Sequence, residues 1–444
     1  MKRSIELTVV VAVLLLLGFA TSTSAQIRVG VNVAPPRIKP GVGTVFVPES
    51  SKTKPGDAGV RAHSNVRVFI PNGLKPQLAP QYSLWGFETP ASLACVYQLV
   101  TVTPGCNPTV VTSVPTGGSN AIAVVVAYDD PWAGPDLAYF SDQFGIPFVD
   151  SQFQVVYATG VQPTQDLSGG WALETSLDIE YAHAMAPKAN IYLVEAASES
   201  LTDLGLAVTV AGNLIQCGAS SCPSGGTGTG EVIMSWGTDE FNTPIPETAF
   251  DTYFTTPGVV YFSAAGDEPG VLYPCASPNV VCSGGTTLAR NPSTGNFLYE
   301  VSWPDAGGGV SAYEPRPSYQ ATVTNLGPTT FRGTPDVSFD SDPYTGVWIW
   351  DSFGFQYFNE TIAGWIPVGG TSVADVAWAG IVNAAGNFYP SSPSELTTMY
   401  GNRTNPSDFH DITVGYCGPY DGYTTLTHYD LCTGIGSDVG YIGK

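Results

Sequence analysis

The feature that most constrains the fold is the alternation of apolar, strand-like runs with helix-like windows after residue 86. The expected strands are 121–127, 190–196, 232–236 and 259–264, and the expected helices are 136–144, 173–185 and 201–214. Continuous apolar strands separated by helices are typical of a mostly parallel sheet that is covered by helices on both faces. We therefore expect a doubly wound α/β domain, in which sites lie at the carboxyl ends of the strands.

The first 25 residues have the pattern of a signal peptide. Lys2 and Arg3 precede an uninterrupted apolar run, residues 7–20, and small residues then precede Gln26. The run is short for a membrane span, although an uncleaved anchor is the alternative. We expect a secreted, or periplasmic, protein with no membrane contact after cleavage of the signal.

The remaining chain divides by composition into a short extension and one domain. Residues 26–85 are rich in Pro and Gly, with weak strand patterning at 66–70, and are expected to form an extension or linker. The expected domain covers residues 86–444. Within it, residues 290–360 are expected to be rich in loops, and a further helix is expected at 372–385.

The chain is acidic and sparsely charged. Of its 444 residues, 38 are Asp or Glu and 16 are Lys or Arg, which gives a formal net charge of −22 at pH 7. Because no basic run occurs along the chain, we exclude nucleic acid as a partner. Much of this charge would be neutralised at about pH 3 to 4, near the ordinary pKa values of Asp and Glu, so an acidic working environment is compatible with the composition.

The eight cysteines occur as neighbours in the sequence. The expected pairs are Cys95 with Cys106, Cys217 with Cys222, Cys275 with Cys282, and Cys417 with Cys432. In an exported protein such neighbours are expected to form local disulfides. Their spacings do not fit a zinc site, which would need tighter Cys or His pairs. The short loops that they close indicate that the disulfides hold surface loops in place.

Two acids on one expected helix are the first candidates for chemistry. Glu174 and Asp178 lie four residues apart, so their side chains share one helix face. A solvated face is the alternative. Because most neighbouring residues are apolar, we expect the helix to be buried, and a buried pair of like charges shares a proton and titrates as a unit.

A hydroxyl and a third acid follow other expected strands. Ser372 comes after Gly369 and Gly370 at the start of a helix, where the helix dipole is positive. A nucleophile would suit this position, and a helix cap formed by Thr371 or Ser372 is the alternative. Asp267 follows an apolar strand and a Gly, which is a suitable position for an active-site loop residue. An ordinary turn residue is the alternative.

Histidine is scarce. The four histidines are His63, His183, His410 and His428, and none stands in the sequence setting of a subtilisin-type catalytic histidine. We expect His183, on an apolar helix, to be a core residue rather than a base. A Ser-His-Asp triad therefore has little support in this chain.

Taken together, these segments resemble the sedolisin family of serine-carboxyl peptidases, acid-active relatives of the subtilisin fold. The resemblance covers about residues 86–440 and includes, in this order, residues 232–237, 273–287, 307–311 and 335–343. It implies that Ser372 is the nucleophile, that Glu174 is its general base or acid and that Asp178 orients Glu174. It also implies that Asp267 is the carboxyl group of the oxyanion hole.

The acidic, Gly-rich tail is a candidate metal site. Asp411 and Asp430, with backbone carbonyls between them, could supply oxygen ligands to Ca²⁺. The resemblance implies one structural Ca²⁺ that is also held by the carbonyl of Ile412. The two glycine carbonyls that complete the family's site would fall at Leu426 and His428.

The same resemblance indicates where a peptide substrate would bind. The segments that could pair with an extended peptide backbone are Ser235, Trp236 and Gly237, and Gly307, Gly308 and Gly309. We expect polypeptide substrates and a monomeric protein. The side-chain preference of the site does not follow from the sequence.

The chain departs from the family pattern at two places. The family's GTSAxxP motif reads Gly-Thr-Ser-Val-Ala-Asp-Val here, so the Pro is absent and Asp375 lies one turn after Ser372. Most members carry a long amino-terminal pro-segment, for which residues 26–85 are too short. Either activation differs in this chain, or it represents a branch without a pro-segment.

These residue types favour acid chemistry. A His base is protonated near pH 4, whereas a carboxylate with a pKa near the operating pH can accept the Ser proton. The sequence therefore predicts a secreted acid endopeptidase that forms an acyl-enzyme on Ser372. A catalytically inactive binding protein on the same scaffold is the alternative. A glycosidase would need carboxyl groups about 5 to 9.5 Å apart across a sugar cleft, and acids on adjacent helix turns are too close for that.

Overall fold

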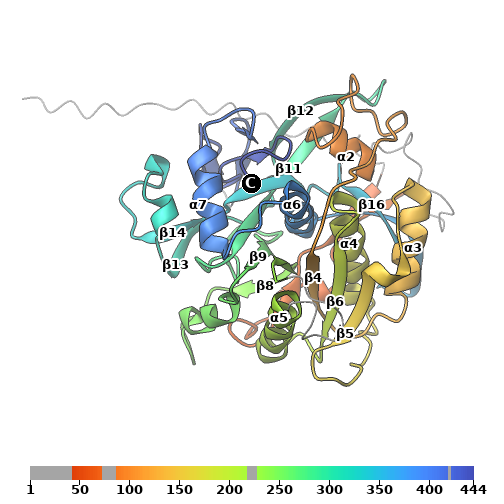
Figure 1. Cartoon of the computed structure of the whole chain (residues 1–444), viewed down its shortest axis with the longest axis horizontal. Helices are drawn as coiled ribbons and strands as arrows, with labels where there is room; N and C mark the ends of the chain where they lie inside the picture. The colour runs from red at the N-terminus through yellow and green to blue at the C-terminus, as the bar shows by residue number, and fades with distance from the viewer. Residues whose placement is uncertain (1–42, 73–86, 218–227, 419–421) are drawn as a thin grey trace, which may run out of the picture.

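The structure is a computed structural model that describes residues 43–72, 87–217, 228–418 and 422–444. Its centre is an eight-stranded sheet in the order β12-β11-β9-β7-β4-β6-β5, with β15 beside β11 (Figure 1). The strands are β4 (Ala121–Ala127), β5 (Phe153–Tyr157), β6 (Asn190–Ala196), β7 (Gly230–Met234), β9 (Val259–Ala264), β11 (Val281–Arg290), β12 (Phe297–Ser302) and β15 (Val337–Asp340). Every pairing in this sheet is parallel except that of β11 with β12.

Helices cover both faces of this sheet. They are α2 (Pro90–Val96), α3 (Ala133–Phe144), α4 (Gly170–Met185), α5 (Leu201–Gln216), α6 (Thr371–Ala385) and α7 (Ser392–Asn402). Glu231 of β7 accepts a hydrogen bond from Asn383 of α6, whereas Tyr261 of β9 approaches Gly212 of α5. Because Tyr261 pairs with Val232, the residue after Glu231, the two side chains point to opposite faces. The predicted doubly wound α/β architecture is confirmed.

The strands before the site are buried, and most of their residues are apolar. All residues of β4, β7 and β9 are buried, as expected for parallel strands with helices on both faces. Every residue of α4 is buried as well, which confirms the expectation of a buried helix. His183 is one of these residues; its ring lies edge-on to Phe148, and burial lowers its pKa to about 4.

A second, antiparallel sheet lies beside the first and has the order β1-β3-β17-β16. Its strands are β1 (Gly43–Phe46), β3 (Arg67–Pro71), β16 (Val347–Tyr357) and β17 (Glu360–Gly369). The sequence places residues 43–72 in an extension or linker, but the structure pairs them with the domain, because their strand partners come from the far end of the chain. The loop-rich region expected at 290–360 is also wrong in part, since it contains β12, β15 and β16.

Smaller elements complete the described chain. A three-stranded sheet joins β2 (His63–Ser64), β8 (Trp236–Asp239) and β10 (Leu272–Tyr273). The remaining pairs are β13 (Gly309–Pro315) with β14 (Phe331–Thr334), β18 (Phe409–His410) with β21 (Ser437–Asp438), and β19 (Tyr416–Cys417) with β20 (Tyr423–Thr424). The short 3₁₀ helices are η1 (Glu49–Ser51), η2 (Asp150–Gln152), η3 (Glu247–Phe254), η4 (Ser318–Gln320) and η5 (Thr324–Leu326).

Three of the four expected disulfides are present: Cys95–Cys106, Cys275–Cys282 and Cys417–Cys432. The fourth expected pair includes Cys222, which lies outside the described residues. Among the helices that the structure describes, none is long and apolar enough to cross a membrane. The expected signal peptide, residues 1–25, also lies outside the described residues.

Candidate active site

The amino-terminal end of α4 is fixed by Asp166. Its side chain accepts hydrogen bonds from the backbone N–H groups of Trp171, at 3.1 Å, and Ser168, at 2.9 Å, so it satisfies donors that a helix terminus leaves unpaired. This cap sets the position of Glu174 and Asp178, which lie on the next two turns. Neither acid is exposed to solvent.

The start of α6 places Ser372 beside α4. Strand β17 ends at Gly369, and Gly370 turns the chain into the helix with a φ of +116°, a backbone conformation that favours glycine. A Cβ atom on Gly370 would lie 2.1 Å from the carbonyl oxygen of Asn65 and 2.7 Å from Oδ2 of Asp267. Only glycine therefore fits here, and Ser372 follows in the first turn of α6.

Asp267 lies three residues after β9 and caps the same helix. Its Oδ1 accepts hydrogen bonds from the Thr371 backbone N–H at 2.7 Å and from the Thr371 hydroxyl at 3.0 Å. Its Oδ2 lies 3.5 Å from Nε of Arg67 and has no hydrogen-bond partner among the described residues. Burial raises the pKa of Asp267 to about 6, although Arg67 and Thr371 act in the opposite direction.

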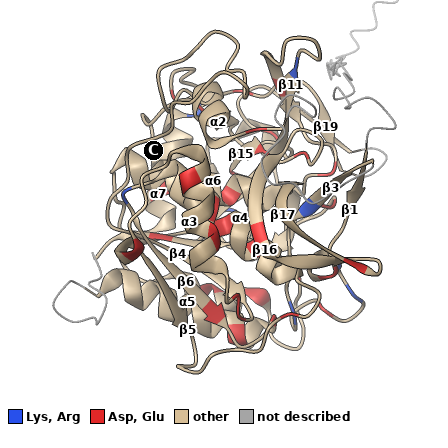
Figure 2. Cartoon of the chain, turned by 90° about the vertical axis from the view of Figure 1, so that its right-hand side faces the viewer, with Lys and Arg blue, Asp and Glu red and all other residues tan. Residues whose placement is uncertain are grey.

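Helices α4 and α6 pack side by side, and both carry acidic residues (Figure 2). Burial, and then the neighbouring Asp178, raise the pKa of Glu174 well above its ordinary value. The Ser372 hydroxyl acts in the opposite direction and lowers this pKa. No hydrogen bond of good geometry joins the two side chains, and the Ser372 Oγ instead donates to the Ser235 carbonyl oxygen at 3.4 Å.

Asp178 is linked to a further acid that the sequence analysis did not assign a role. The Ser235 hydroxyl donates to Oδ1 of Asp178 at 2.7 Å and lies 3.1 Å from Oδ1 of Asp375. A hydroxyl has one proton to give, so full hydrogen bonds to both acids require a proton on one of the two carboxyl groups. Burial, and then repulsion from Asp178, raise the pKa of Asp375 well above its ordinary value, in agreement with a protonated state.

The structure therefore brings together the four predicted catalytic side chains. Glu174 and Asp178 come from α4, Asp267 follows β9, and Ser372 begins α6. Their catalytic roles stay predictions, because proximity alone does not establish them. The arrangement supplies a hydroxyl, a proton acceptor beside it and a carboxyl group that can donate a proton toward the same region.

The predicted substrate-binding segments differ in their surroundings. Trp236 and Gly237 begin β8, which pairs with β2 on one side and with β10 on the other. The N–H groups of Gly307 and Gly308 donate to the carbonyl oxygens of Gly266, at 2.8 Å, and Gly270, at 2.7 Å. These two donors thus support the loop of Asp267, and β13 begins at Gly309. Their role in binding a substrate stays a prediction.

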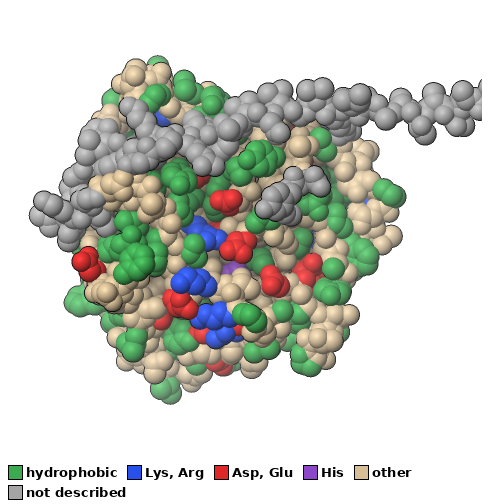
Figure 3. Space-filling model, turned by 180° about the vertical axis from the view of Figure 1, so that it is seen from behind, with side chains coloured by type: hydrophobic (Ala, Val, Ile, Leu, Met, Phe, Trp, Pro, Cys, Tyr) green, Lys and Arg blue, Asp and Glu red, His purple; other side chains and the backbone are tan. Residues whose placement is uncertain are grey.

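Two hollows open beside the Arg67–Asp267 pair. One, of about 60 Å³, is also lined by His63, Ser64 and Asn65. The other, of about 330 Å³, is lined by the same pair together with residues that include Trp303, Asp305 and Tyr344. The face of the molecule shown in Figure 3 carries basic and acidic side chains next to each other.

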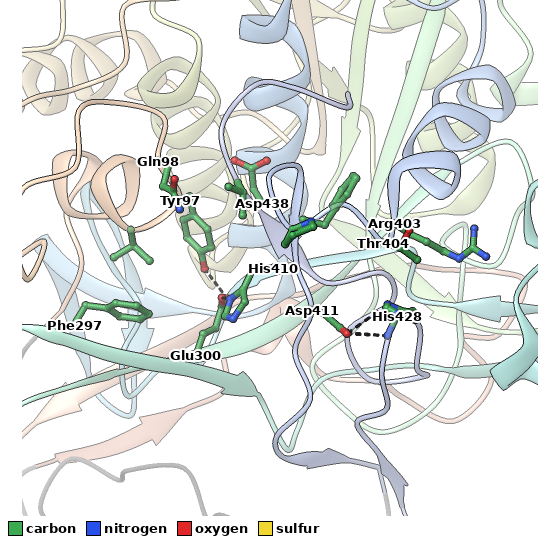
Figure 4. A pocket seen from close by; sticks show the side chains of 14 residues that line it. Tyr97, Gln98, Phe297, Glu300, Arg403, Thr404, His410, Asp411, His428 and Asp438 are labelled. Atoms are coloured by element: carbon green, nitrogen blue, oxygen red, sulfur yellow. Dashed lines mark hydrogen bonds and ion pairs between the residues drawn. The ribbon is translucent and has the colours of Figure 1, made fainter.

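A larger cavity, of about 600 Å³, has none of the four predicted catalytic residues in its lining (Figure 4). Its polar residues include Glu300, which accepts from Tyr97 at 2.9 Å and lies 3.2 Å from Nδ1 of His410. The contact with Glu300 raises the pKa of His410. Because the lining contains neither Ser nor Cys, this cavity offers no side-chain nucleophile of the predicted type.

The predicted calcium ligands lie in one loop region, and the carboxyl oxygens of its two acids accept hydrogen bonds from the loop backbone. Both carboxyl oxygens of Asp411 accept from the backbone N–H of His428 at 3.0 Å (Figure 4). Asp430 accepts the N–H of Leu426 on Oδ2, and those of Cys432 and Thr433 on Oδ1. As arranged, both carboxyl groups are turned toward backbone N–H groups, whereas Ca²⁺ takes about six to eight oxygen ligands.

No mechanistic step is therefore assigned to calcium. Ile412, whose carbonyl is also expected to bind the ion, is a buried residue next to Asp411. No group of three or more His, Cys, Asp or Glu side chains able to hold a metal occurs in the described part of the chain. Calcium binding stays an untested prediction.

Two residues of this site were missed by the sequence analysis. Asn65 and Arg67 lie within the segment expected to be a linker, yet Asn65 contacts Ser235 and Ser372, and Arg67 contacts Asp267. The weak strand patterning at 66–70 was the available signal. It could not reveal the site, because these contacts join residues 170 or more positions apart.

Comparison with known proteins identifies relatives of the chain. No protein-family model matches it. Kumamolisin from Bacillus sp. (strain MN-32) is 32% identical over an alignment of 310 residues, and the match covers 63% of this chain and 51% of kumamolisin. Sedolisin from Pseudomonas sp. (strain 101) is 26% identical over an alignment of 363 residues, and the match covers 73% of this chain and 57% of sedolisin. Xanthomonalisin from Xanthomonas sp. (strain T-22) is 26% identical over an alignment of 381 residues, and the match covers 74% of this chain and 44% of xanthomonalisin.

The chain thus spans about half the length of the curated relatives it matches. Among solved structures, Pseudomonas sedolisin, a serine-carboxyl proteinase complexed with two molecules of pseudo-iodotyrostatin, matches with a TM-score of 0.63 and 24% identity. The match covers 79% of this chain and 95% of that structure. It confirms the predicted subtilisin-like α/β fold.

Proposed function

Because the chain belongs to the sedolisin family of serine-carboxyl peptidases, we propose that it is a secreted, acid-active serine endopeptidase. Its substrates are polypeptides, and the reaction passes through an acyl-enzyme on Ser372. The observation that carries the proposal is the convergence of Ser372, Glu174 and Asp267 from three separate elements onto one buried point. Three local disulfides are in keeping with an exported protein.

In the proposed reaction, Ser372 attacks the carbonyl carbon of a substrate peptide bond and Glu174 accepts its proton. The buried pair of Glu174 and Asp178 holds one proton between two carboxyl groups, so one group can accept while the other remains neutral. Glu174 then returns the proton to the leaving amine, and water hydrolyses the resulting ester. Asp178 acts as a positioning residue that fixes Glu174 beside the hydroxyl.

Asp267 is proposed to stabilise the negative charge that develops on the substrate oxygen. A carboxyl group can donate a hydrogen bond only while it is protonated, and its Oδ2 is free of hydrogen bonds among the described residues. Since the pKa of Asp267 is about 6, this donor is present at pH 4 and is lost as the pH rises above 6. We therefore expect activity in acid and a loss of activity toward neutral pH.

The test is hydrolysis of denatured casein by the purified protein at pH 4 and at pH 8. We expect turnover at pH 4 and a loss on the order of 10⁶-fold in Ser372→Ala, because the nucleophile is removed. Ser338→Ala is the matched control: this serine is also buried and its Oγ is unpartnered among the described residues, but it lies on β15.

Each outcome separates the proposal from the alternative of an inactive binding protein. A folded wild-type protein that leaves casein intact at both pH values would favour the binding protein. Full activity in Ser372→Ala would exclude Ser372 as the nucleophile, and equal losses in Ser338→Ala would indicate a structural effect instead.

A further inference from the structure

The side chain of Lys444 is buried in the carboxyl-terminal region. Its Nζ lies 2.6 Å from Oδ1 of Asp438, and neither of the two side chains is exposed to solvent. Lys is almost never fully buried unless its charge is paired. Asp438 supplies that pairing, and the other contacts of Nζ show what kind of site holds the charge.

Backbone carbonyl oxygens form most of the surroundings of Nζ. The ammonium group donates toward the carbonyl oxygens of Asp408 at 2.6 Å, Gly440 and Ile442 at 3.1 Å, and Val439 at 3.4 Å. Together with Oδ1 of Asp438, these are five oxygens, whereas an ammonium group has only three protons to donate. Such a surplus of oxygens resembles the carbonyl and carboxylate cages in which proteins hold cations.

Two aromatic rings complete the surroundings of the ammonium group. Its Nζ lies 4.7 Å from the centre of the Phe409 ring and 5.8 Å from that of the Trp378 ring. A cation within about 6 Å of an aromatic ring is attracted to it, and aromatic cages recognise alkylated ammonium ligands in this way. Trp378 belongs to α6, so the cation joins the carboxyl-terminal segment to the helix that begins beside Ser372.

The distances suit an ammonium ion better than Ca²⁺. Ca²⁺ needs oxygens at about 2.3–2.6 Å, whereas three of the five oxygens lie at 3.1 Å or more from Nζ. Hydrogen bonds from nitrogen to oxygen measure about 2.7–3.2 Å. The shape and chemistry of the site therefore favour a nitrogen cation.

A soluble amine has a route to this site. Phe409, Asp438 and Val439 contact Nζ of Lys444 and also line the cavity of about 600 Å³ (Figure 4). A small molecule in the cavity thus meets the groups that surround the ammonium ion.

We propose that these groups form a cation site whose resident ligand is the ammonium group of Lys444, and that the site takes a free primary alkylammonium ion when this group is absent. The lysine serves the carboxyl-terminal segment as a built-in structural cation. The inference goes beyond the proposed function, because none of the four predicted catalytic residues contributes to this site.

The experiment measures thermal unfolding of the full chain as wild type, Lys444→Ala and Lys444→Met. It is done at pH 8, because burial raises the pKa of Asp438 to about 7, although Lys444 acts in the opposite direction. We expect the Tm of both variants to fall by on the order of 5 °C, since each leaves a buried carboxylate unpaired.

Added propylammonium chloride tests the cation site itself. Lys444→Ala removes the equivalent of one propylammonium ion, whereas Met fills the same space with a neutral side chain. We expect propylammonium to restore most of the lost Tm in Lys444→Ala and none in Lys444→Met, relative to its effect on the wild type. Propanol, the neutral counterpart, should restore none in either variant.

A measurement on the wild type alone keeps the test independent of variants that fail to fold. Brief acetylation of the folded protein, read by peptide mass spectrometry, should modify Lys52 and Lys54, whose side chains are 48% and 44% exposed. It should leave Lys444 unmodified until the protein is unfolded.

Three results would overturn the cation site. They are a Tm of Lys444→Met equal to that of the wild type, a rescue of Lys444→Ala by propanol as large as that by propylammonium, and the absence of any rescue by propylammonium. Acetylation of Lys444 as fast as that of Lys52 in the folded protein would contradict it as well.

Discussion

Two regions of the molecule contain buried acids whose carboxyl oxygens differ in their hydrogen bonds. Between α4 and α6, both carboxyl oxygens of Glu174 and one oxygen each of Asp178, Asp267 and Asp375 lack a hydrogen-bond partner among the described residues. In the carboxyl-terminal loop, both oxygens of Asp430 accept hydrogen bonds from backbone N–H groups. These carboxyl oxygens of the first region are therefore without hydrogen bonds among the described residues and can bind a proton. Those of Asp430 in the second region hold a loop in place.

The difference has an energetic meaning. A buried polar atom without a partner costs free energy, so native structures keep few of them, and those that remain call for a functional explanation. Carboxyl groups with strongly raised pKa values are also typical of catalytic sites. The comparison therefore predicts that changes between α4 and α6 act on turnover, whereas changes in the loop act on stability.

Among the acidic residues, the largest effect is expected from Asp267→Ala. Loss of one oxyanion donor lowers turnover by about 10²–10³-fold, so kcat for a peptide substrate at pH 4 should fall by that factor. Asp430→Ala is the matched control, measured on the fraction of folded protein. Equal losses of kcat in the two variants would erase the distinction between the regions.

A pH-dependent loss of stability is the next effect. Asp267 has an ordinary pKa of 3.8 and a folded-state pKa of about 6, so the folded state binds the extra proton between these values. Its stabilising contribution is complete below pH 3.8 and is lost as the pH rises through 6, which amounts to about 3 kcal/mol.

The measurement is the free energy of unfolding of wild type and of Asp267→Asn, which cannot titrate, from pH 4 to pH 7. We expect the wild type to lose about 3 kcal/mol more than the variant over this range. Parallel curves would show that Asp267 titrates at its ordinary pKa.

A smaller loss of stability is expected from Asp430→Ala. The change leaves the N–H groups of Leu426, Cys432 and Thr433 without their acceptor, at a cost of about 1–3 kcal/mol. Thermal unfolding measures it, with and without a chelator. A Tm of the wild type that falls in chelator, while that of Asp430→Ala does not, would instead support the calcium site that the sequence predicts.

The smallest effect is expected from Asp375→Ala. This acid reaches Asp178 only through the Ser235 hydroxyl, so we expect it to position the pair rather than to react, with a loss of about tenfold in kcat/KM. Because removal of a neighbouring acid makes ionisation easier, the pH profile should also shift to lower pH. Asp375→Asn, which keeps a donor for Ser235, should restore the rate, and failure of this rescue would contradict a positioning role.

The sequence allowed prediction of those parts that depend on local pattern. The strands at 121–127, 190–196 and 259–264 match β4, β6 and β9 because short, mostly apolar runs favour buried strands. The burial of α4 was predicted because most residues beside its two acids are apolar. Its acids could be assigned because their spacing of four residues fixes their relation on a helix.

Contacts between distant segments could not be predicted in this way. Residues 43–72 read as a linker because β3 is short and its partner, β17, lies some 300 residues away. Asn65 and Arg67 lie in this segment, so their contacts with the site were not predicted. Asp375 stood out as a departure from the family motif, but its link to Asp178 depends on Ser235, which comes from a third segment.

The central claim, that the site works only while Asp267 holds a proton, is tested most directly by the pH dependence of kcat/KM from pH 3 to pH 8. The account predicts that the wild type loses activity as the pH rises through about 6, and that Asp267→Asn, which donates without a titrating proton, retains more of its activity there. A wild-type rate that increases toward pH 8, or identical profiles for the two proteins, would contradict it.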